Sequence, residues 1–507
     1  MSTIRRYHSA SWDEAVIHEL GAPGRRGVIP PAPWAPAAES PFPAGLERVN
    51  DADLPELAEY EVRRHYTHLA QQTLGMMGIS LFGTCTMKHS PTVNEQVGAR
   101  HELAAVHPRQ DPSTYQGVLG MIHSFEAELC NLSGMDAFSF QPGGGADAAY
   151  LHAVITRAYH ASRGELAQRT QVVTTAQAHP CNPAAAKAAG FDLITLAIEE
   201  DGYPSLEALK AVIGPNTAAL MLNNPDDMGI YNPQIKAFIE AVHDVGGLAF
   251  YDNANFNGVM TRLRARELGF DACMFMLHKT FGAPKGGNGP SVGAYGCSEE
   301  LAKFLPGPRV VKTEVGYDLV EPEESVGRVR EFIGNVQQVV KAYSWTRAMG
   351  TDGLREAADI SVLSNNYMEK RLMRIPGVTM SFPGKALPRL EMTRYSLEEY
   401  SAETGLTAVD VQNRMTDFGI DAMWLSHEPW IVPEPFTPEA GEMWSKEDLD
   451  EWIDVLAHVL DEGRVDPERV RTAPHNQAVA QIDGSGLDNP DTWAVTWAAY
   501  RRKHASA

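Results

Sequence analysis

The chain has 507 residues, of which 44% are hydrophobic and 21% are charged, an ordinary balance for a soluble globular protein with two or three domains. Its formal net charge of −22 argues against nucleic acid or an anionic membrane as a partner, because both repel an acidic surface. Its five cysteines are scattered and none forms a CxxC pair, so we expect no metal site and a reducing, cytoplasmic location.

The N-terminal part, residues 1–95, is predicted to form an arm followed by helices. It has no apolar stretch of the signal-peptide type, and the chain has no uncharged run near the roughly 18 apolar residues of a membrane span. Residues 21–58 are too rich in proline and glycine for a helix or a central strand. We expect an extended arm lying on the globular body, with Trp34 and Phe42 available for burial; a disordered tail is the alternative.

Residues 96–345 alternate between helices and short apolar strands, which predicts a mostly parallel seven-stranded sheet covered on both faces. Residues 117–134 have the pattern of an amphipathic helix ended by glycine. The runs of strand length are DAFSFQ, QVVTTA, LITLAI, AALMLNN and GLAFYDNA. Residues 329–350 are predicted to form a long helix that bridges domains.

Residues 346–507 have a different character and predict a smaller α+β domain with a tail. Helical patterns cover residues 361–375, 407–419 and 446–463. Two strand-like pieces, VTMSF and RLEMTRY, lie between the first two of these helices. The last residues, from 479 onward, are expected to pack loosely.

Lys279 gives the strongest chemical signal, because it follows the apolar run CMFMLH and precedes a glycine-rich stretch. A lysine at a strand end should reach the crevice at the carboxyl edge of the sheet, where open α/β sheets bind ligands. An apolar setting disfavours the ammonium form and helps the amine form an imine. Asp252 ends another strand 27 residues earlier, and pyridoxal phosphate (PLP) needs a carboxylate beside its ring nitrogen.

Two further signals lie upstream. His179 follows the strand QVVTTA and could stack on a cofactor ring, and the turn QPGGGA opens a helix whose N-terminus suits a phosphate. Singly, each feature has an ordinary alternative: a solvated lysine, a helix-capping aspartate, a core histidine or a simple turn. Their order along the chain, each at a strand end, favours a PLP enzyme of fold type I.

At these residues the chain resembles the glycine dehydrogenase (decarboxylating) family, the P-protein of the glycine cleavage system, and specifically its separate subunit 2. The likeness extends over nearly the whole length. It rests on the segments PGRRG, VRRHYTHLAQQ, GTCTMKHSPTVNE, HPRQ, QPGGGA, HPCNPAAAKAAGF, YDNAN, LHKTFGAPKGGNGP, SAETGLTAVDV, WIVPE and APH.

The resemblance implies roles for particular residues. Lys279 carries PLP as a Schiff base, Asp252 supports the pyridine nitrogen and His179 stacks on the ring. The other expected cofactor-binding residues are Gly143, Gly144, Gly145, Ala146, Asn255, His278 and Thr280. The expected substrate-pocket residues are Thr84, Cys85, Lys88, His107, Asn182 and Asn224; for Cys85 a small buried filler is the favoured alternative.

The implied reaction is the PLP-dependent decarboxylation of glycine, with the aminomethyl group passed to the lipoyl arm of the small H-protein. Subunit 2 of this family works with a separate subunit 1 that lacks the lysine, so that partner is implied. A homodimer or a heterotetramer with subunit 1 is expected from the resemblance.

The sequence departs from the family pattern inside its most constrained motifs. The changed positions are Gly143, Gly144, Asp147, Ala148, Ala149, Pro180, Cys181, Asp226, Asp227, Asn253, Lys285 and Asn288. Because a site built to pair particular polar groups discriminates strongly among analogues, these changes leave a second hypothesis open. It is a stand-alone PLP enzyme that acts on another small amino acid by decarboxylation, carbanion addition or transamination. A non-catalytic scaffold is a third hypothesis, disfavoured because Lys279, Asp252 and His179 are all present.

Overall fold

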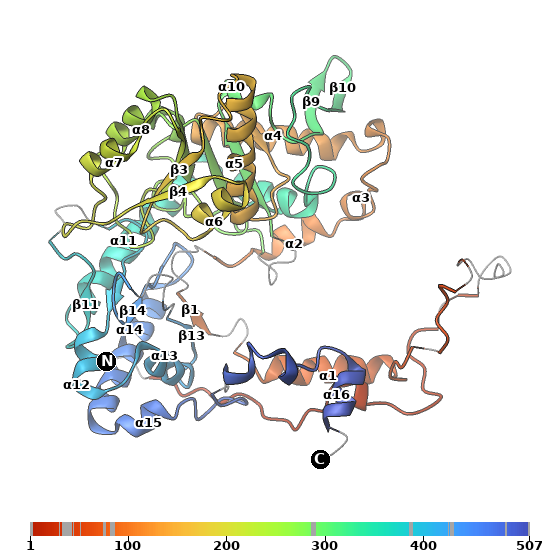
Figure 1. Cartoon of the computed structure of the whole chain (residues 1–507). Helices are drawn as coiled ribbons and strands as arrows, with labels where there is room; N and C mark the ends of the chain where they lie inside the picture. The colour runs from red at the N-terminus through yellow and green to blue at the C-terminus, as the bar shows by residue number, and fades with distance from the viewer. Residues whose placement is uncertain are drawn as a thin grey trace.

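The protein consists of a large domain, a small domain and an extension built from both ends of the chain (Figure 1). The computed structural model describes residues 4–29, 31–32, 43, 45–50, 52–74, 78–81, 87–284, 291–384, 389–423, 425, 430–481 and 484–504.

The large domain is built on a seven-stranded sheet with the strand order β2-β8-β7-β6-β5-β3-β4. Strand β8 runs antiparallel to both of its neighbours, and the other six strands share one direction. The strands are β2 (Ala137–Ser139), β3 (Gln171–Thr175), β4 (Asp192–Leu196), β5 (Thr217–Asn223), β6 (Leu248–Asp252), β7 (Ala272–Met276) and β8 (Gly293–Cys297). The predicted mostly parallel, seven-stranded sheet is confirmed.

Helices cover both faces of this sheet because its strands are apolar at successive positions. On one face Leu220 and Phe275 pack in a buried cluster with α4 (Gln116–Ser133) and α8 (Ile235–Asp244). On the other face their chain neighbours Met221 and Met274 pack with α5 (Gly145–Ser162) and α6 (Cys181–Ala188). The predicted glycine stop of α4 is also confirmed: Gly134 follows the helix with φ 75°.

Shorter elements complete the large domain. The helices are α2 (Thr92–Gly98), α3 (His101–Ala104), η3 (Pro112–Thr114), α7 (Leu206–Val212), α9 (Ala265–Leu268) and α10 (Glu299–Ala302). Strands β9 (Arg309–Thr313) and β10 (Gly316–Val320) form an antiparallel hairpin.

The element α11 (Val336–Leu372) links the two domains and consists of two helical segments that meet at a kink at Gly350, where φ is 63° (Figure 1). It contributes Leu354 to the large-domain core and Met368 to the small-domain core. The prediction that the helix starts near residue 329 was wrong. Phe332 and Gly334 have positive φ angles of 58° and 85°, which a right-handed helix does not allow, so residues 329–335 form an irregular segment.

The small domain contains a three-stranded antiparallel sheet in the order β11-β12-β14 and a parallel pair of β1 with β13. Its strands are β11 (Thr379–Met380), β12 (Tyr395–Ser396), β14 (Pro435–Phe436), β1 (Ile79–Ser80) and β13 (Ile420–Ala422). Its helices are α12 (Glu398–Thr404), α13 (Ala408–Thr416), α14 (Lys446–Val465) and α15 (Pro467–Arg471). Ile79 and Leu81 join the small-domain core although they come from the N-terminal part of the chain.

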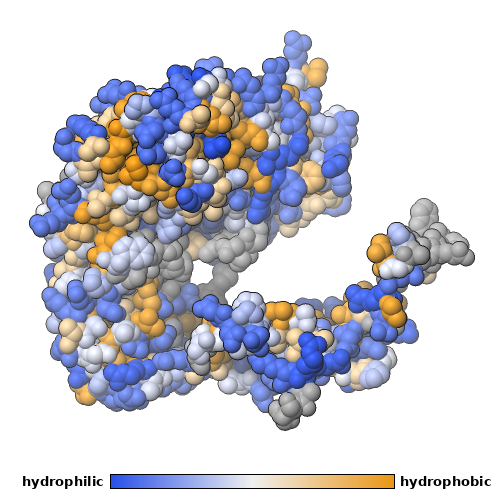
Figure 2. All heavy atoms as spheres, in the orientation of Figure 1, coloured by the Kyte–Doolittle hydropathy of each residue, from blue (hydrophilic) through white to orange (hydrophobic). Residues whose placement is uncertain are grey.

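The extension combines η1 (Ile17–Glu19), α1 (Glu59–Gln71) and the C-terminal α16 (Trp497–His504). It projects from the small domain and leaves an open space before the large domain (Figures 1 and 2). We expected residues 21–58 to lie on the globular body, but Ala22 donates to Glu56 O and Arg25 pairs with Glu61 of α1. Trp34 and Phe42 lie outside the described residues. Among the helices that are described, none is both long enough and apolar enough to cross a bilayer.

Candidate functional site

The carboxyl edge of the sheet brings the predicted chemical residues together. Asp252 is the last residue of β6 and is paired in register with Asn223 of β5 and Met274 of β7. Lys279 lies three residues beyond the end of β7. Both side chains are buried, with Asp252 4% and Lys279 8% exposed. An amine and a carboxylate are therefore buried at one edge of the sheet, close enough for the charge of Lys279 to act on Asp252.

Asp252 is held by two hydrogen-bond donors. Asn182 Nδ2 donates to Oδ2 at 2.9 Å, and the Ala254 N–H donates to Oδ1 at 3.1 Å. Burial raises the pKa of Asp252, whereas the two hydrogen bonds and the positive charge of Lys279 act in the opposite direction. Asn182 Oδ1 is buried and has no hydrogen-bond partner among the described residues. Asn182 thus serves to orient the carboxylate.

Lys279 is linked to the loop that follows β6. Its Nζ donates to Asn255 Oδ1 at 3.4 Å, and the neighbouring Thr280 Oγ1 accepts a hydrogen bond from the Phe256 N–H at 3.3 Å. His278 is buried, and its Nδ1 lies 3.1 Å from Val292 O. The three residues 278–280 therefore bind two different loops and fix the position of the lysine stem.

His179 lies in the turn between β3 and α6, two residues before the helix begins at Cys181. The Cys181 N–H donates to His179 Nδ1 at 3.1 Å, which fixes the orientation of the half-buried imidazole ring. Burial raises the pKa of the Cys181 thiol well above its usual value, so this cysteine is a neutral thiol in the crevice. Its charge environment includes Asp252 and Lys279, which places the departure at Cys181 inside the site.

The glycine turn leads into the N-terminus of α5, which begins at Gly145. Gly143 O accepts a hydrogen bond from Ser291 Oγ at 2.6 Å, and the Gly143 N–H donates to Asp147 Oδ2 at 2.9 Å. Gly145 and Ala146 form the first helical turn, whose free N–H groups make a site for an anion. The glycine turn and this helix start lie where the sequence predicts the phosphate site, and that role stays a prediction.

The expected pocket residues have different surroundings. Thr84 and Cys85, and also Lys285, lie outside the described residues. His107 is exposed, and its Nδ1 accepts a hydrogen bond from the Arg109 N–H at 3.1 Å. Asn224 is buried behind the edge, where its Oδ1 accepts from the Asn232 N–H at 2.7 Å. Within the described part of the chain, no contact links His107 or Asn224 to Lys279.

Lys88 is a buried link between domains. Its Nζ donates to Asn257 Oδ1 at 3.0 Å, forms an ion pair with Glu442 and lies 4.5 Å above the ring of Trp345. Burial lowers the pKa of Lys88, and the charge of Glu442 raises it. Asn257 also donates to Ser361 Oγ of α11 at 2.7 Å. The sequence pattern did not predict this link, because the residues that form it are far apart in the chain.

Other departures have local explanations. Asp226 Oδ1 accepts the N–H groups of Met228 and Ile230, both at 2.9 Å, so its carboxylate closes a turn. Ala149 is buried inside α5. Asn253 is buried, and its Nδ2 has no hydrogen-bond partner among the described residues. Nothing in the structure explains Pro180, which is exposed at the N-cap of α6.

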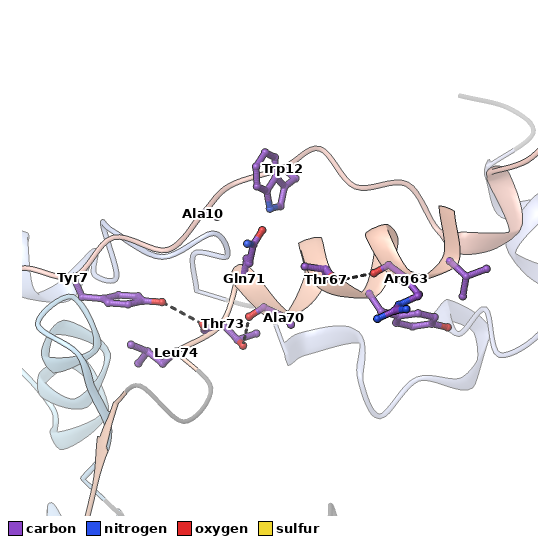
Figure 3. Close-up of a pocket in the computed structure, with 11 residues that line it drawn as sticks. Tyr7, Ala10, Trp12, Arg63, Thr67, Ala70, Gln71, Thr73 and Leu74 are labelled. Atoms are coloured by element: carbon purple, nitrogen blue, oxygen red, sulfur yellow. Dashed lines mark hydrogen bonds between the residues drawn. The ribbon is translucent and has the colours of Figure 1, made fainter. Parts of the chain in front are cut away.

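A surface groove of about 1010 Å³ lies in the extension, and its lining residues are far in sequence from Asp252 and Lys279. It lies between Trp12 and the helix α1, and Tyr7 donates from its hydroxyl to Thr73 O at one end (Figure 3). It contains Arg63 but no other charged side chain. The groove therefore has none of the groups that the predicted reaction needs.

The residues at the sheet edge fit PLP. A buried amine, a buried carboxylate, an oriented imidazole and a glycine turn at a helix N-terminus match its aldehyde, ring nitrogen, ring face and phosphate. Within the described ranges, no group of three or more His, Cys, Asp or Glu side chains could hold a metal ion.

Comparisons with known proteins agree with this geometry. The aminotransferase class-V family model matches residues 145–420. The probable glycine dehydrogenase (decarboxylating) subunit 2 of Pyrococcus furiosus is 39% identical over 500 residues, which cover 98% of each chain. The protein of the same name from Bacillus cytotoxicus is 37% identical over 481 residues, 93% of this chain and 95% of that one.

Solved structures show the same fold. The P-protein glycine decarboxylase of the glycine cleavage system, in inhibitor-bound form, has a TM-score of 0.68 and 23% identity over 82% of this chain and 92% of its own. The cysteine desulfurase CsdA from Escherichia coli has a TM-score of 0.57 and 15% identity over 76% and 95%. The predicted fold class, PLP-dependent transferase fold type I, is confirmed.

Proposed function

Because the chain belongs to the family of glycine dehydrogenase (decarboxylating) subunit 2, we propose that it carries the PLP-dependent decarboxylation of glycine. The predicted resemblance is confirmed, and the protein is a PLP-dependent enzyme. The observation that carries the proposal is the placement of Lys279, Asp252, His179 and the glycine turn along one edge of the sheet.

Each of these residues has a proposed task. When bound, PLP supplies an electron sink for the pair left behind by departing CO₂. Lys279 holds the cofactor through its amine, and Asp252 keeps a proton on the ring nitrogen. His179, oriented by the Cys181 N–H, covers one ring face. The residues that would hold the phosphate of the cofactor are Gly143, Gly144, Gly145 and Ala146, at the start of α5.

The loop after β6 positions the lysine. Asn255 accepts a hydrogen bond from Lys279 Nζ, and Thr280 accepts from the N–H of Phe256 in the same loop. Asn255 would thus hold the free amine of Lys279 beside the loop after β6. A buried amine in this position could act as a base toward a proton of the substrate.

The subunit 2 names of the relatives support a companion subunit 1 as a partner. Transfer of the aminomethyl group to a lipoyl H-protein and a homodimeric or heterotetrameric state are further parts of the proposal. A cytoplasmic location remains a prediction that rests on cysteine usage.

Exchange of labelled bicarbonate into the carboxylate of glycine tests the proposal. The full chain is supplied with PLP, subunit 1 and H-protein, and we expect label in glycine that disappears in Lys279→Ala. Lys303→Ala, an exposed lysine paired with Glu324, is the matched control and should exchange normally. No exchange with glycine, together with a cofactor spectrum that responds to another amino acid, would favour the stand-alone enzyme and reject this proposal.

A further inference from the structure

The irregular segment Arg328–Asn335 lies directly against the glycine turn. The Val329 N–H donates to Gln141 Oε1 at 3.2 Å. Gly334 has φ 85°, and a Cβ there would lie 2.2 Å from Phe140 O, so only glycine allows this approach. Two contacts on either side of residue 330 therefore hold the segment against residues 140–141.

Arg330 lies between these two contacts, and its guanidinium covers Gly143. A Cβ at Gly143 would lie 2.2 Å from Arg330 Cζ, so the guanidinium fills the space that a side chain would need. Arg330 Nε lies 3.3 Å from Asp147 Oδ2, the same oxygen that accepts the Gly143 N–H. Arginine, aspartate and turn backbone thus form one connected group at the start of α5.

Asp147 creates an electrostatic problem at this place. It lies in the first turn of α5, at the helix end proposed to hold the cofactor phosphate. A carboxylate beside a phosphate disfavours binding because the two negative charges repel each other. The Arg330 guanidinium offsets the charge of Asp147 and adds a cation beside the turn.

A contribution to fold stability does not explain the pair. The side chains of Arg330 and Asp147 are 42% and 40% exposed, and ion pairs at such exposure contribute little to stability. The guanidinium of Arg330 also lies where a side chain at residue 143 would stand, directly over the turn backbone. Because the Arg330–Asp147 pair contacts the backbone of the glycine turn, we favour a role in binding the ligand of that turn.

We propose that Arg330 is the cation of the cofactor-phosphate site and that Asp147 holds its guanidinium over the glycine turn. The proposal rests on the proposed position of the phosphate at the α5 N-terminus. It assigns a positioning role to Asp147, which departs from the family pattern. Arg330 offsets the negative charge that Asp147 brings to the site.

Equilibrium dialysis of the full-length apo protein against PLP and against pyridoxal, which lacks the phosphate, tests this role. Arg330→Gln should raise the Kd for PLP by roughly 10-fold or more, as expected for the loss of a charge-assisted contact. The Kd for pyridoxal should change by less than about 2-fold, because pyridoxal has no phosphate for Arg330 to meet.

Two further variants complete the design. Asp147→Asn keeps an acceptor for the Gly143 N–H, so Asp147→Asn/Arg330→Gln should recover PLP affinity to within about 3-fold of wild type. Arg328→Gln removes an exposed arginine from the same segment, one paired with Glu321, and should bind PLP normally.

The outcomes separate the possibilities. Unchanged PLP affinity in Arg330→Gln, or an equal loss for PLP and pyridoxal, would overturn the inference; an equal loss would mean that Arg330 only supports the turn. No recovery in the double variant would overturn the pairing with Asp147. A wild-type protein that does not bind PLP would instead reject the proposed function and the inference together.

Discussion

Asp252 is a buried acid whose ionised form is stabilised by the side-chain amide of Asn182. Asn182 Nδ2 donates to it, and the pKa of Asp252 is already raised by burial. Loss of this hydrogen bond raises the pKa further, because the charged form loses a stabilising partner. The protonation of Asp252 on β6 therefore depends on Asn182, which lies on α6.

Asn182→Ala is expected to move the acidic limb of the pH–kcat profile to higher pH. The direction follows because the ionised carboxylate is the active form, and it is lost at a higher pH when its pKa rises. The profile of the bicarbonate exchange measures the shift. Asn366→Ala, which removes an amide that donates to Val362 O and Arg389 O away from Asp252, is the control. A profile that falls in height without moving would contradict the role assigned to Asn182.

Lys88 connects elements of the two domains that are far apart in the sequence. Its ammonium joins the segment after β1, the loop after β6, the small-domain residue Glu442 and the ring of Trp345 on α11. The side chains of Lys88 and Glu442 are 5% and 14% exposed. Removing one partner of a pair buried to this extent leaves the other charge without compensation.

Lys88→Met is therefore expected to destabilise the protein by about 3 kcal/mol, and Lys88→Met/Glu442→Gln to recover part of that loss. Urea unfolding measures the change. The fluorescence that is lost in Trp345→Phe isolates one of the nine tryptophans and reports the contact, since the ammonium lies over this ring. Lys303→Met, which breaks an exposed pair with Glu324, should cost less than about 1 kcal/mol. Equal costs in the two single variants would contradict a buried link.

Elements with a regular pattern were predictable from the sequence, and contacts between distant segments were not. The large-domain strands and α4 follow from apolar runs and the stop at Gly134, both local signals. The start of α11 was missed because Phe332 takes φ 58° under tertiary constraint, against its local preference. Ile79 enters the small-domain core by pairing with Ile420, a register that no local pattern encodes.

In the candidate site, likewise, local patterns pointed to the residues at strand ends but not to those from distant segments. Strand ends placed Asp252 and Lys279 on one edge because parallel strands end together. Arg330 could not be found in this way, because it lies in a stretch with a helical pattern and reaches Gly143 only through the fold. The groups that touch the cofactor site from other segments thus appear only in three dimensions.

At the scale of the whole molecule, the junction of the two domains contains an acid without a partner. Glu391 is fully buried, and neither carboxylate oxygen has a hydrogen-bond partner among the described residues. It lies against Gly258 of the large domain, where a Cβ would contact its carboxylate. Burial, with a smaller effect of Glu439, raises the pKa of Glu391 from 4.5 to about 8.

This raised pKa makes the junction sensitive to pH. The folded protein holds the Glu391 proton more tightly than the unfolded chain does, so the contribution of Glu391 to stability is fully present below pH 4.5. It falls as the pH rises from 4.5 through about 8, by at most about 1.4 kcal/mol per pH unit. Above that range an ionised carboxylate is buried between the domains without compensation.

Glu391→Gln removes this titration while keeping the shape of the side chain. We expect its melting temperature to match that of the wild type at pH 5 and to exceed it at pH 8.5 by on the order of 1–3 °C. Differential scanning calorimetry at both values measures the difference, with the exposed Glu323→Gln as the matched control. If the difference in melting temperature were the same at pH 5 and pH 8.5, Glu391 would be ionised at both, and a cation would have to reach it in the folded protein. A difference that grows with pH would instead mean that the contact between the domains is most stable in mildly acidic buffer.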